Sequence, residues 1–426
     1  MSAGSCEDAG NVPTVVLIAG SPMSSSVATI PDAARRARLA VIGIFLVAGF
    51  SFSAWAVRIP DIKGKLALSE GQLGLALLGM AAGSIVAMTA TGFLISRFGS
   101  RAVTTFAALM VCAALPLLAQ AGSGPLLFGT LFVFGGFYGM MDVAMNAQAV
   151  LVEERYQRPI MSSFHGFFSV GALLGAALAA FIAGQGINPQ WHLLGTGSTL
   201  VPLVLLASTA LIAAREQETA SDGPAFAFPV GPLAGIGAIA FCALLAEGAV
   251  ADWSAVYLRE NLGAGAAAAG IGYTAFSLTM AAGRFSGDTL IQRIGPARVV
   301  RWGGVFVAGG LGLALLIGSI PAMILGFACV GIGLAAAFPI AISAAGRVPG
   351  VPAGTALAAI ATAGYTGFLV GPPTIGLISN AIGLRGGLAV VALLGVVMIL
   401  LAPKAANAEG GAHATALAEA GSEIAG

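Results

Sequence analysis

The sequence predicts an all-α integral membrane protein in which twelve transmembrane helices form two bundles of six. Twelve apolar stretches are long enough to cross a bilayer, since a helix rises about 1.5 Å per residue and about 20 apolar residues span the hydrocarbon layer. The polar segment 215–229 separates the first six from the last six. The stretches lie near residues 39–57, 72–95, 102–120, 125–150, 161–184, 194–214, 230–257, 268–291, 299–318, 321–345, 354–379 and 385–403.

The composition agrees with this class. Apolar residues make up 58% of the chain and charged residues 9%, whereas soluble domains carry about 25% charged residues. The 61 glycines and 20 prolines are tolerated in membrane helices, where small residues allow close packing. A net charge of +1 indicates no nucleic-acid partner, and the four cysteines lack metal-ligand spacing. We expect a monomer in a lipid bilayer, without a metal or cofactor.

The predicted domain order is symmetric about the central segment. It comprises a disordered N-terminal tail at 1–34, an N-terminal bundle at 35–214, a central cytoplasmic loop at 215–229, a C-terminal bundle at 230–403 and a disordered tail at 404–426. With twelve spans, both chain ends share one side of the membrane. That side collects thirteen Lys and Arg residues against five opposite, so the positive-inside rule places both termini in the cytoplasm. We expect the bacterial inner membrane.

The two halves resemble each other, which predicts an internal repeat. Trp55 in the first half precedes Gly99 by nearly the same spacing as Trp253 precedes Gly295 in the second. Both glycines lie in a basic turn between the second and third spans of their half. Parallel repeats of this kind are typical of transporters whose substrate site lies between the repeats.

The turn after the second span resembles the signature loop of the major facilitator superfamily, Gly-x-x-x-Asp-Arg-x-Gly-x-Arg. Ser96 replaces the Asp of that pattern, which puts the usual charge relay of this gate in doubt, and the second half retains Arg293 and Gly295. The matching positions of the first half are Gly92, Arg97, Gly99 and Arg101. The resemblance covers residues 35–403 and implies that family's fold of two pseudo-symmetric bundles.

Three longer segments are similar to one bacterial branch of this superfamily. The branch includes the membrane protein MosC and is distantly similar to fucose–proton symporters. The segments are WAVRIPDIKGKLALSEGQLG, MMDVAMNAQAVLVEERYQRPIMSSFHG and AGRFSGD.

Four carboxylates fall inside predicted spans: Asp142, Glu247, Asp252 and Asp288. A charge in hydrocarbon costs about 3 kcal/mol even on insertion scales, so each acid must face a partner or a water-filled cavity. In the superfamily, spans one, four, seven and ten line the central cavity. The resemblance therefore implies that Asp142 and Glu247 face each other from opposite halves.

Asp142, Asn146 and Tyr138 lie one helical turn apart on a single stripe of span four. This stripe predicts hydrogen bonding to substrate or carriage of a proton, and the alternative is a buried acid with a structural partner. Glu247 is the leading proton-site candidate, with a structural hydrogen bond to span eleven as its alternative. Asp252 lies nearer the end of its span, where a gate or helix-end role competes with a direct one.

The remaining candidates are two tryptophans, a histidine and an ion pair. Arg284 and Asp288 are four residues apart in span eight, which predicts an intrahelical pair that holds a gate. His165 could change protonation near neutral pH, or make a capping contact. Trp55 and Trp253 could anchor at the membrane interface or stack on a sugar face.

These features favour secondary active transport of a small hydrophilic solute, such as a sugar or polyol, by alternating access. Proton-coupled symport is the main hypothesis, with the proton gradient as energy source, and proton-coupled efflux of a metabolite or drug is the alternative. An intramembrane enzyme or sensor is disfavoured, because the sequence shows neither a catalytic constellation nor a soluble output domain.

Overall fold

The computed structural model describes residues 32–157, 160–213 and 227–424, with side chains up to residue 406 apart from residue 162. Most of the predicted N-terminal tail and central loop lie outside these ranges. The described residues form helices, as predicted. Those of the N-terminal half are α1 (Asp32–Ala56), α2 (Ile59–Leu66), α3 (Glu70–Phe98), α4 (Ser100–Gln120), α5 (Gly124–Tyr156), α6 (Met161–Gly184) and α7 (Pro189–Ala210).

The C-terminal half repeats this plan with more interruptions. Span seven ends in a π-helical turn, and spans nine and ten are each built from shorter segments. Its elements are α8 (Leu233–Val256), η1 (Tyr257–Asn261), α9 (Ala266–Ile294), α10 (Pro296–Val305), η2 (Phe306–Leu311), α11 (Gly312–Ile317), α12 (Ile320–Leu334), α13 (Ala337–Ala345), α14 (Ala353–Ile382) and α15 (Leu384–Ile424).

Apolar length explains why these helices cross a bilayer. Eleven helical stretches among the described residues are long and apolar enough to span a membrane. The remaining pass is α9, which has 29 residues, as α3 does, but carries Arg284, Asp288 and Arg293. Polar groups in a span of this kind must find partners within the protein.

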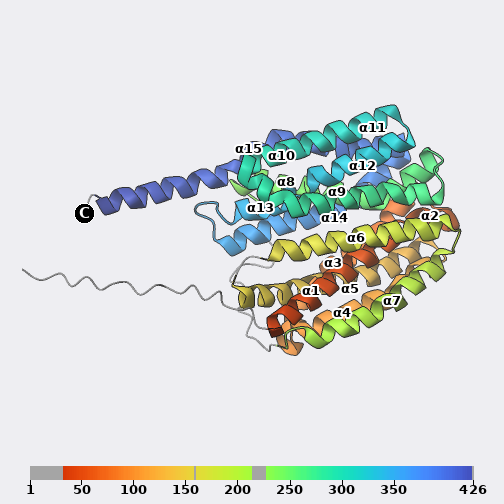
Figure 1. Ribbon diagram of the computed structural model, residues 1–426. Coiled ribbons are helices and arrows are strands. Elements are labelled where there is room, and N and C mark those ends of the chain that lie inside the picture. The colour runs from red at the N-terminus through yellow and green to blue at the C-terminus, as the bar shows by residue number, and fades with distance from the viewer. Residues whose placement is uncertain (1–31, 158–159, 214–226, 425–426) are drawn as a thin grey trace, which may run out of the picture.

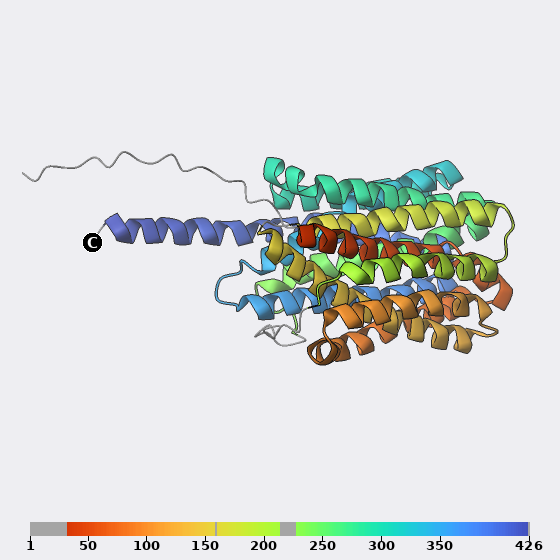
Figure 2. The ribbon, with the colours of Figure 1, turned by 60° about the horizontal axis from the view of Figure 1, so that its bottom comes forward.

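The two halves lie side by side as separate groups of helices (Figure 1), which overlap in the turned view of Figure 2. Helices α6 and α9 contact each other across the boundary between the halves, and so do α3 and α14. We call the end of the bundle at which α1 begins the near end. The opposite end, which carries α2, is the far end.

Local signals set the helix ends. Ser69 and Gln72 form a capping box at the start of α3, because each side chain bonds the other residue's backbone, at 3.2 and 2.9 Å. Gly99 joins α3 to α4 at φ +82°, and Gly295 joins α9 to α10 at φ +80°. This backbone region favours glycine, so the two matched turns confirm the internal repeat.

Glycines bring the halves into backbone contact at the far end. A Cβ added to Gly376 of α14 would lie 2.7 Å from the carbonyl oxygen of Glu70. A Cβ added to Gly74 of α3 would lie 2.6 Å from the carbonyl oxygen of Pro372. Side chains at either position would force α3 and α14 apart, so this contact holds the far end closed.

The last helix departs from the sequence analysis. A disordered tail is expected from residue 404, but α15 continues as a helix to Ile424 and projects beyond the bundle (Figure 1). Its extension is rich in Ala and Glu, which have high intrinsic helix propensity, and this explains the difference.

Candidate functional site

The boundary between the halves carries an ion pair in the middle of the bundle. Glu247 of α8 accepts hydrogen bonds from Arg284 Nη2 of α9, at 3.2 Å to Oε1 and 3.4 Å to Oε2. The same guanidinium donates through Nη1 to Ser169 Oγ of α6, at 2.8 Å. The Glu247 and Arg284 side chains are 19% and 18% exposed. Arg284 therefore links the charge of the C-terminal half to the N-terminal half.

This arrangement corrects the predicted pair between Arg284 and Asp288. Asp288 is exposed and makes no ion pair with any residue that the structure describes. A largely buried guanidinium is stabilised when several acceptors bond it at once. Glu247 and Ser169 together supply three acceptor oxygens, whereas the exposed Asp288 would supply a single carboxylate. Ser169 was not among the sequence-predicted site residues, since a serine in a membrane helix gives no distinguishing signal.

Asp142 of α5 makes a second contact across the boundary. Asn146 Nδ2 donates to its carboxylate Oδ1 at 3.3 Å and to its backbone oxygen at 2.8 Å. Tyr365 of α14 donates through its hydroxyl to Asp142 Oδ2, at 3.4 Å. The Tyr138 hydroxyl instead donates to the Ala48 carbonyl oxygen of α1, at 3.2 Å.

The predicted acid–amide stripe thus exists and faces the other half of the protein. Tyr365 completes it from α14, a partner that the sequence analysis did not identify. Asp142 contacts Tyr365 of α14, in the other half. Glu247 contacts Arg284 of α9, which in turn contacts Ser169 of α6, in the other half. A change in the charge of either acid would alter a contact between the halves.

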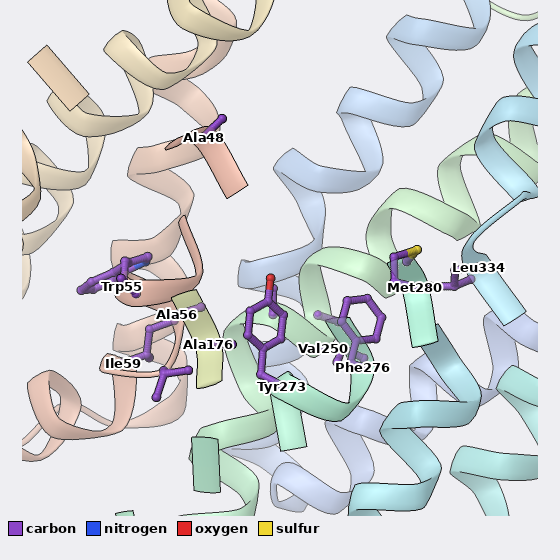
Figure 3. Close-up of a cluster of buried hydrophobic side chains, with 14 of the residues drawn as sticks. Ala48, Trp55, Ala56, Ile59, Ala176, Val250, Tyr273, Phe276, Met280 and Leu334 are labelled. Atoms are coloured by element: carbon purple, nitrogen blue, oxygen red, sulfur yellow. The ribbon is translucent and has the colours of Figure 1, made fainter. Parts of the chain in front are cut away.

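The other predicted acid and both tryptophans are buried in this conformation. Asp252 is 9% exposed, and it makes no hydrogen bond within the described part of the chain. Trp55 and Trp253 are fully buried, and their indole N–H groups have no partner among the described residues. Figure 3 shows Trp55 among apolar side chains that include Ile59, apart from Tyr273 of α9. Neither ring is exposed to lipid or accessible to a solute here.

His165 lies close to the ion pair along α6. Its imidazole is exposed and packs edge-on against Phe45, with ring centroids 5.3 Å apart. Its backbone oxygen accepts a hydrogen bond from Ser169 Oγ at 3.2 Å. The histidine is therefore one helical turn from the serine that binds Arg284.

The predicted gating turn is formed by Gly99 and its neighbours at the near end. A Cβ added to Gly92 would have no atom within 4 Å apart from its chain neighbours and the backbone of its own helix. The guanidinium carbon of Arg97 lies over the Phe98 ring, 5.6 Å from its centroid. Arg101 lines a surface groove of about 600 Å³ with Phe98 of α3, other residues of α4 and Ser208 of α7.

Ser96, at the position of the family's Asp, donates to the Phe93 carbonyl oxygen of its own helix at 2.9 Å. Arg293, in the matching turn of the other half, is exposed. The first-half turn thus shows no charge relay through position 96.

The residues that the structure describes hold no cluster of three or more metal-ligating His, Cys, Asp or Glu side chains. The contacts described above are paired charges and hydrogen bonds at the boundary between the halves.

Comparison with known proteins gives consistent matches. A model of the Major Facilitator Superfamily matches residues 40–239 and 236–419. An uncharacterized MFS-type transporter of Yersinia pestis is 39% identical over 350 residues, which is 82% of this chain and 91% of that protein. Membrane protein MosC of Rhizobium meliloti is 33% identical over 359 residues, covering 83% and 86% of the two chains. The MosC match confirms the resemblance predicted from the sequence.

Solved structures share the fold. The nucleoside transporter NupG superposes with a TM-score of 0.69 at 13% identity, covering 87% of this chain and 98% of its own. FucP in its outward conformation gives a TM-score of 0.59 at 17% identity, covering 86% and 98%.

Proposed function

Because the chain belongs to the Major Facilitator Superfamily, a family of transporters, we propose that it carries a small hydrophilic solute by proton-coupled symport. The observation that supports this proposal is the bridge from Glu247 through Arg284 to Ser169. It places an acid in a contact between the two halves, and alternating access requires those halves to move against each other.

Protonation of Glu247 gives the bridge a chemical switch. A neutral carboxyl group attracts a guanidinium less strongly than a carboxylate does, so a bound proton weakens the pair with Arg284. Arg284 then has a donor free for a solute or for water, and its guanidinium is no longer held by Glu247 in the position from which it bonds Ser169. Binding of the proton and rearrangement of the halves are linked through one side chain.

The polar groups at the boundary suit a solute rich in hydroxyl groups. Asp142, Asn146 and Tyr365 supply acceptors and donors within one cluster, and the charge of Arg284 is neutralised by Glu247. A sugar or polyol can satisfy such groups without adding a net charge. NupG is described as a nucleoside transporter, and a nucleoside also carries sugar hydroxyls, so nucleosides belong to the same class of candidates.

The near end of the bundle faces the cytoplasm in this proposal, and the protein acts as a monomer in the bacterial inner membrane. The excess of Lys and Arg residues on that side supports this orientation.

Uptake into proteoliposomes tests the proposal. Purified protein is reconstituted with an imposed pH gradient, acidic outside, and supplied with labelled hexoses, polyols and nucleosides. We expect accumulation of at least one solute, its loss on addition of a protonophore, and solute-dependent alkalinisation of the outer medium. Solute movement opposite to the proton gradient would indicate antiport and overturn the symport assignment.

A further inference from the structure

The far end carries four charged side chains that pair across the boundary between the halves. Asp61 and Lys63 lie two residues apart on α2, and Arg259 and Glu260 are adjacent on η1. Arg259 Nη1 pairs with Asp61 Oδ1, and Lys63 Nζ pairs with Glu260 Oε2. We call these four residues the far-end quartet. On α2 the acidic residue precedes the basic one, and on η1 the basic residue precedes the acidic one, so both pairs can form at the same time.

The π-helical turn η1 places the two C-terminal members of the quartet. A π-turn adds a residue to the helical repeat and changes the direction in which side chains project, and such turns are frequent at functional sites. Here Arg259 and Glu260 are consecutive residues that both reach α2, which contacts the C-terminal half at the far end (Figure 1).

Each α2 member of the quartet also has a partner in its own half. Asp61 Oδ2 accepts from Arg58 Nη1 at 2.8 Å, while its Oδ1 accepts from Arg259. Lys63 Nζ lies 3.4 Å from Glu70 Oε1, at the start of α3. Separation of the halves would therefore leave both residues paired.

Arg58, the partner of Asp61 within the N-terminal half, is fixed by further contacts. Arg58 is 2% exposed, and its Nη2 donates to the Ile187 carbonyl oxygen at 2.8 Å. Its Nε donates to Nδ1 of His192, a buried residue of α7, at 3.1 Å. This cation is fixed within the N-terminal half and does not depend on the other half.

The exposure of the quartet side chains agrees with this pattern of partners. The Lys63 side chain is 8% exposed, whereas Arg259 is 37% and Glu260 is 32% exposed. Removing one partner from a buried charge is strongly destabilising, but an exposed charge regains water. The buried residues keep a partner when the halves separate, and the residues that lose theirs are the accessible ones.

From these contacts we propose that the far-end quartet is a partner-exchange lock, through which the closed far end is stabilised and can still open at low cost. On opening, Asp61 retains Arg58 and Lys63 retains Glu70, while Arg259 and Glu260 become hydrated. The quartet thus adds gating residues at the far end to the glycine contact between α3 and α14. The inference relies on the alternating-access part of the proposed function, but neither the solute nor the coupling ion enters it.

Two substitutions, each at an acidic partner of Lys63, distinguish this lock from an ordinary salt bridge. Glu260→Gln removes the partner that exists only when the far end is closed, so it should favour opening. Glu70→Gln removes the partner that Lys63 needs when the far end is open, so it should favour closure. Both acids are about one-third exposed, at 32% and 31%, so water can reach the amide that replaces either carboxylate.

The readout is the distance between spin labels at Gly122 and Ile382, exposed far-end positions in opposite halves, after all four cysteines are replaced by alanine. Double electron–electron resonance spectroscopy of the protein in nanodiscs, without solute, gives the ratio of molecules with an open far end to molecules with a closed one. We expect Glu260→Gln to raise this ratio about two- to fivefold and Glu70→Gln to lower it by a similar factor. Arg259→Gln should act like Glu260→Gln.

The matched control is Arg385→Gln, which removes an exposed far-end charge whose hydrogen bond, to the Leu316 carbonyl oxygen, stays within one half. It should leave the ratio unchanged. A shift of Glu260→Gln and Glu70→Gln in the same direction, or no shift in either, would overturn the lock. Opposite shifts in a protein that accumulates no solute would instead contradict the transport proposal alone.

Discussion

The ion pair between Glu247 and Arg284 should show a favourable coupling free energy in a double-mutant cycle. The Nη2 and Oε1 atoms are 3.2 Å apart. At an effective dielectric constant of about 20, this separation gives a gross attraction of about 5 kcal/mol. Desolvation of two side chains that are less than one-fifth exposed offsets much of it. We therefore expect a net coupling of about 1–3 kcal/mol.

The assay is the free energy of unfolding, measured by titration with denaturing detergent. Arg284→Met leaves the Glu247 carboxylate without its cation, so this single variant should be the least stable of the set. Adding Glu247→Gln removes the unpaired charge, so the double variant should lose less than the sum of the two single changes. Arg97→Met combined with Glu247→Gln is the control and should be additive, because Arg97 lies in the near-end turn. Additivity within about 0.5 kcal/mol for Arg284 as well would refute the pairing.

Three further predictions follow from local geometry. Gly376→Ala inserts a Cβ 2.7 Å from a backbone oxygen of α3, so it should lengthen the far-end label distance; an unchanged distance would contradict closure by this contact. Gly99→Ala should lower the free energy of unfolding by about 1–3 kcal/mol because of its φ of +82°. Gly92→Ala, in open space within α3, should raise it by up to about 1 kcal/mol, and equal effects at the two glycines would refute the turn argument. Tyr365→Phe removes the donor to Asp142 and should weaken apparent solute affinity about fivefold, without loss of folded protein in size-exclusion chromatography.

Local chemistry made much of the fold predictable. Apolar length predicted the spans, and the basic Gly turns at Gly99 and Gly295 predicted where paired helices meet. The Ser69–Gln72 capping box needs four consecutive residues and no tertiary information. Each of these features depends on the helix that carries it, or on its immediate neighbours along the chain.

Partner choice was not predictable in the same way. Spacing along α9 allowed Arg284 to pair with Asp288, but the fold buries the arginine against other helices and leaves the aspartate exposed. The Arg259–Asp61 contact joins residues almost half a chain apart. The basic residues of the WAVRIPDIKGK segment were counted among the five on the side opposite the termini. No local pattern indicated that a π-helical turn would present two opposite charges to this segment. Tertiary placement decides these pairs.

Accumulation and exchange, measured on the same variants, test whether the acids at the boundary couple proton movement to transport. Asp142→Asn and Glu247→Gln are reconstituted in proteoliposomes with a solute that the wild-type protein accumulates. Both variants should lose accumulation driven by a pH gradient, while solute exchange between equal concentrations continues. Undiminished accumulation in both variants would contradict this coupling.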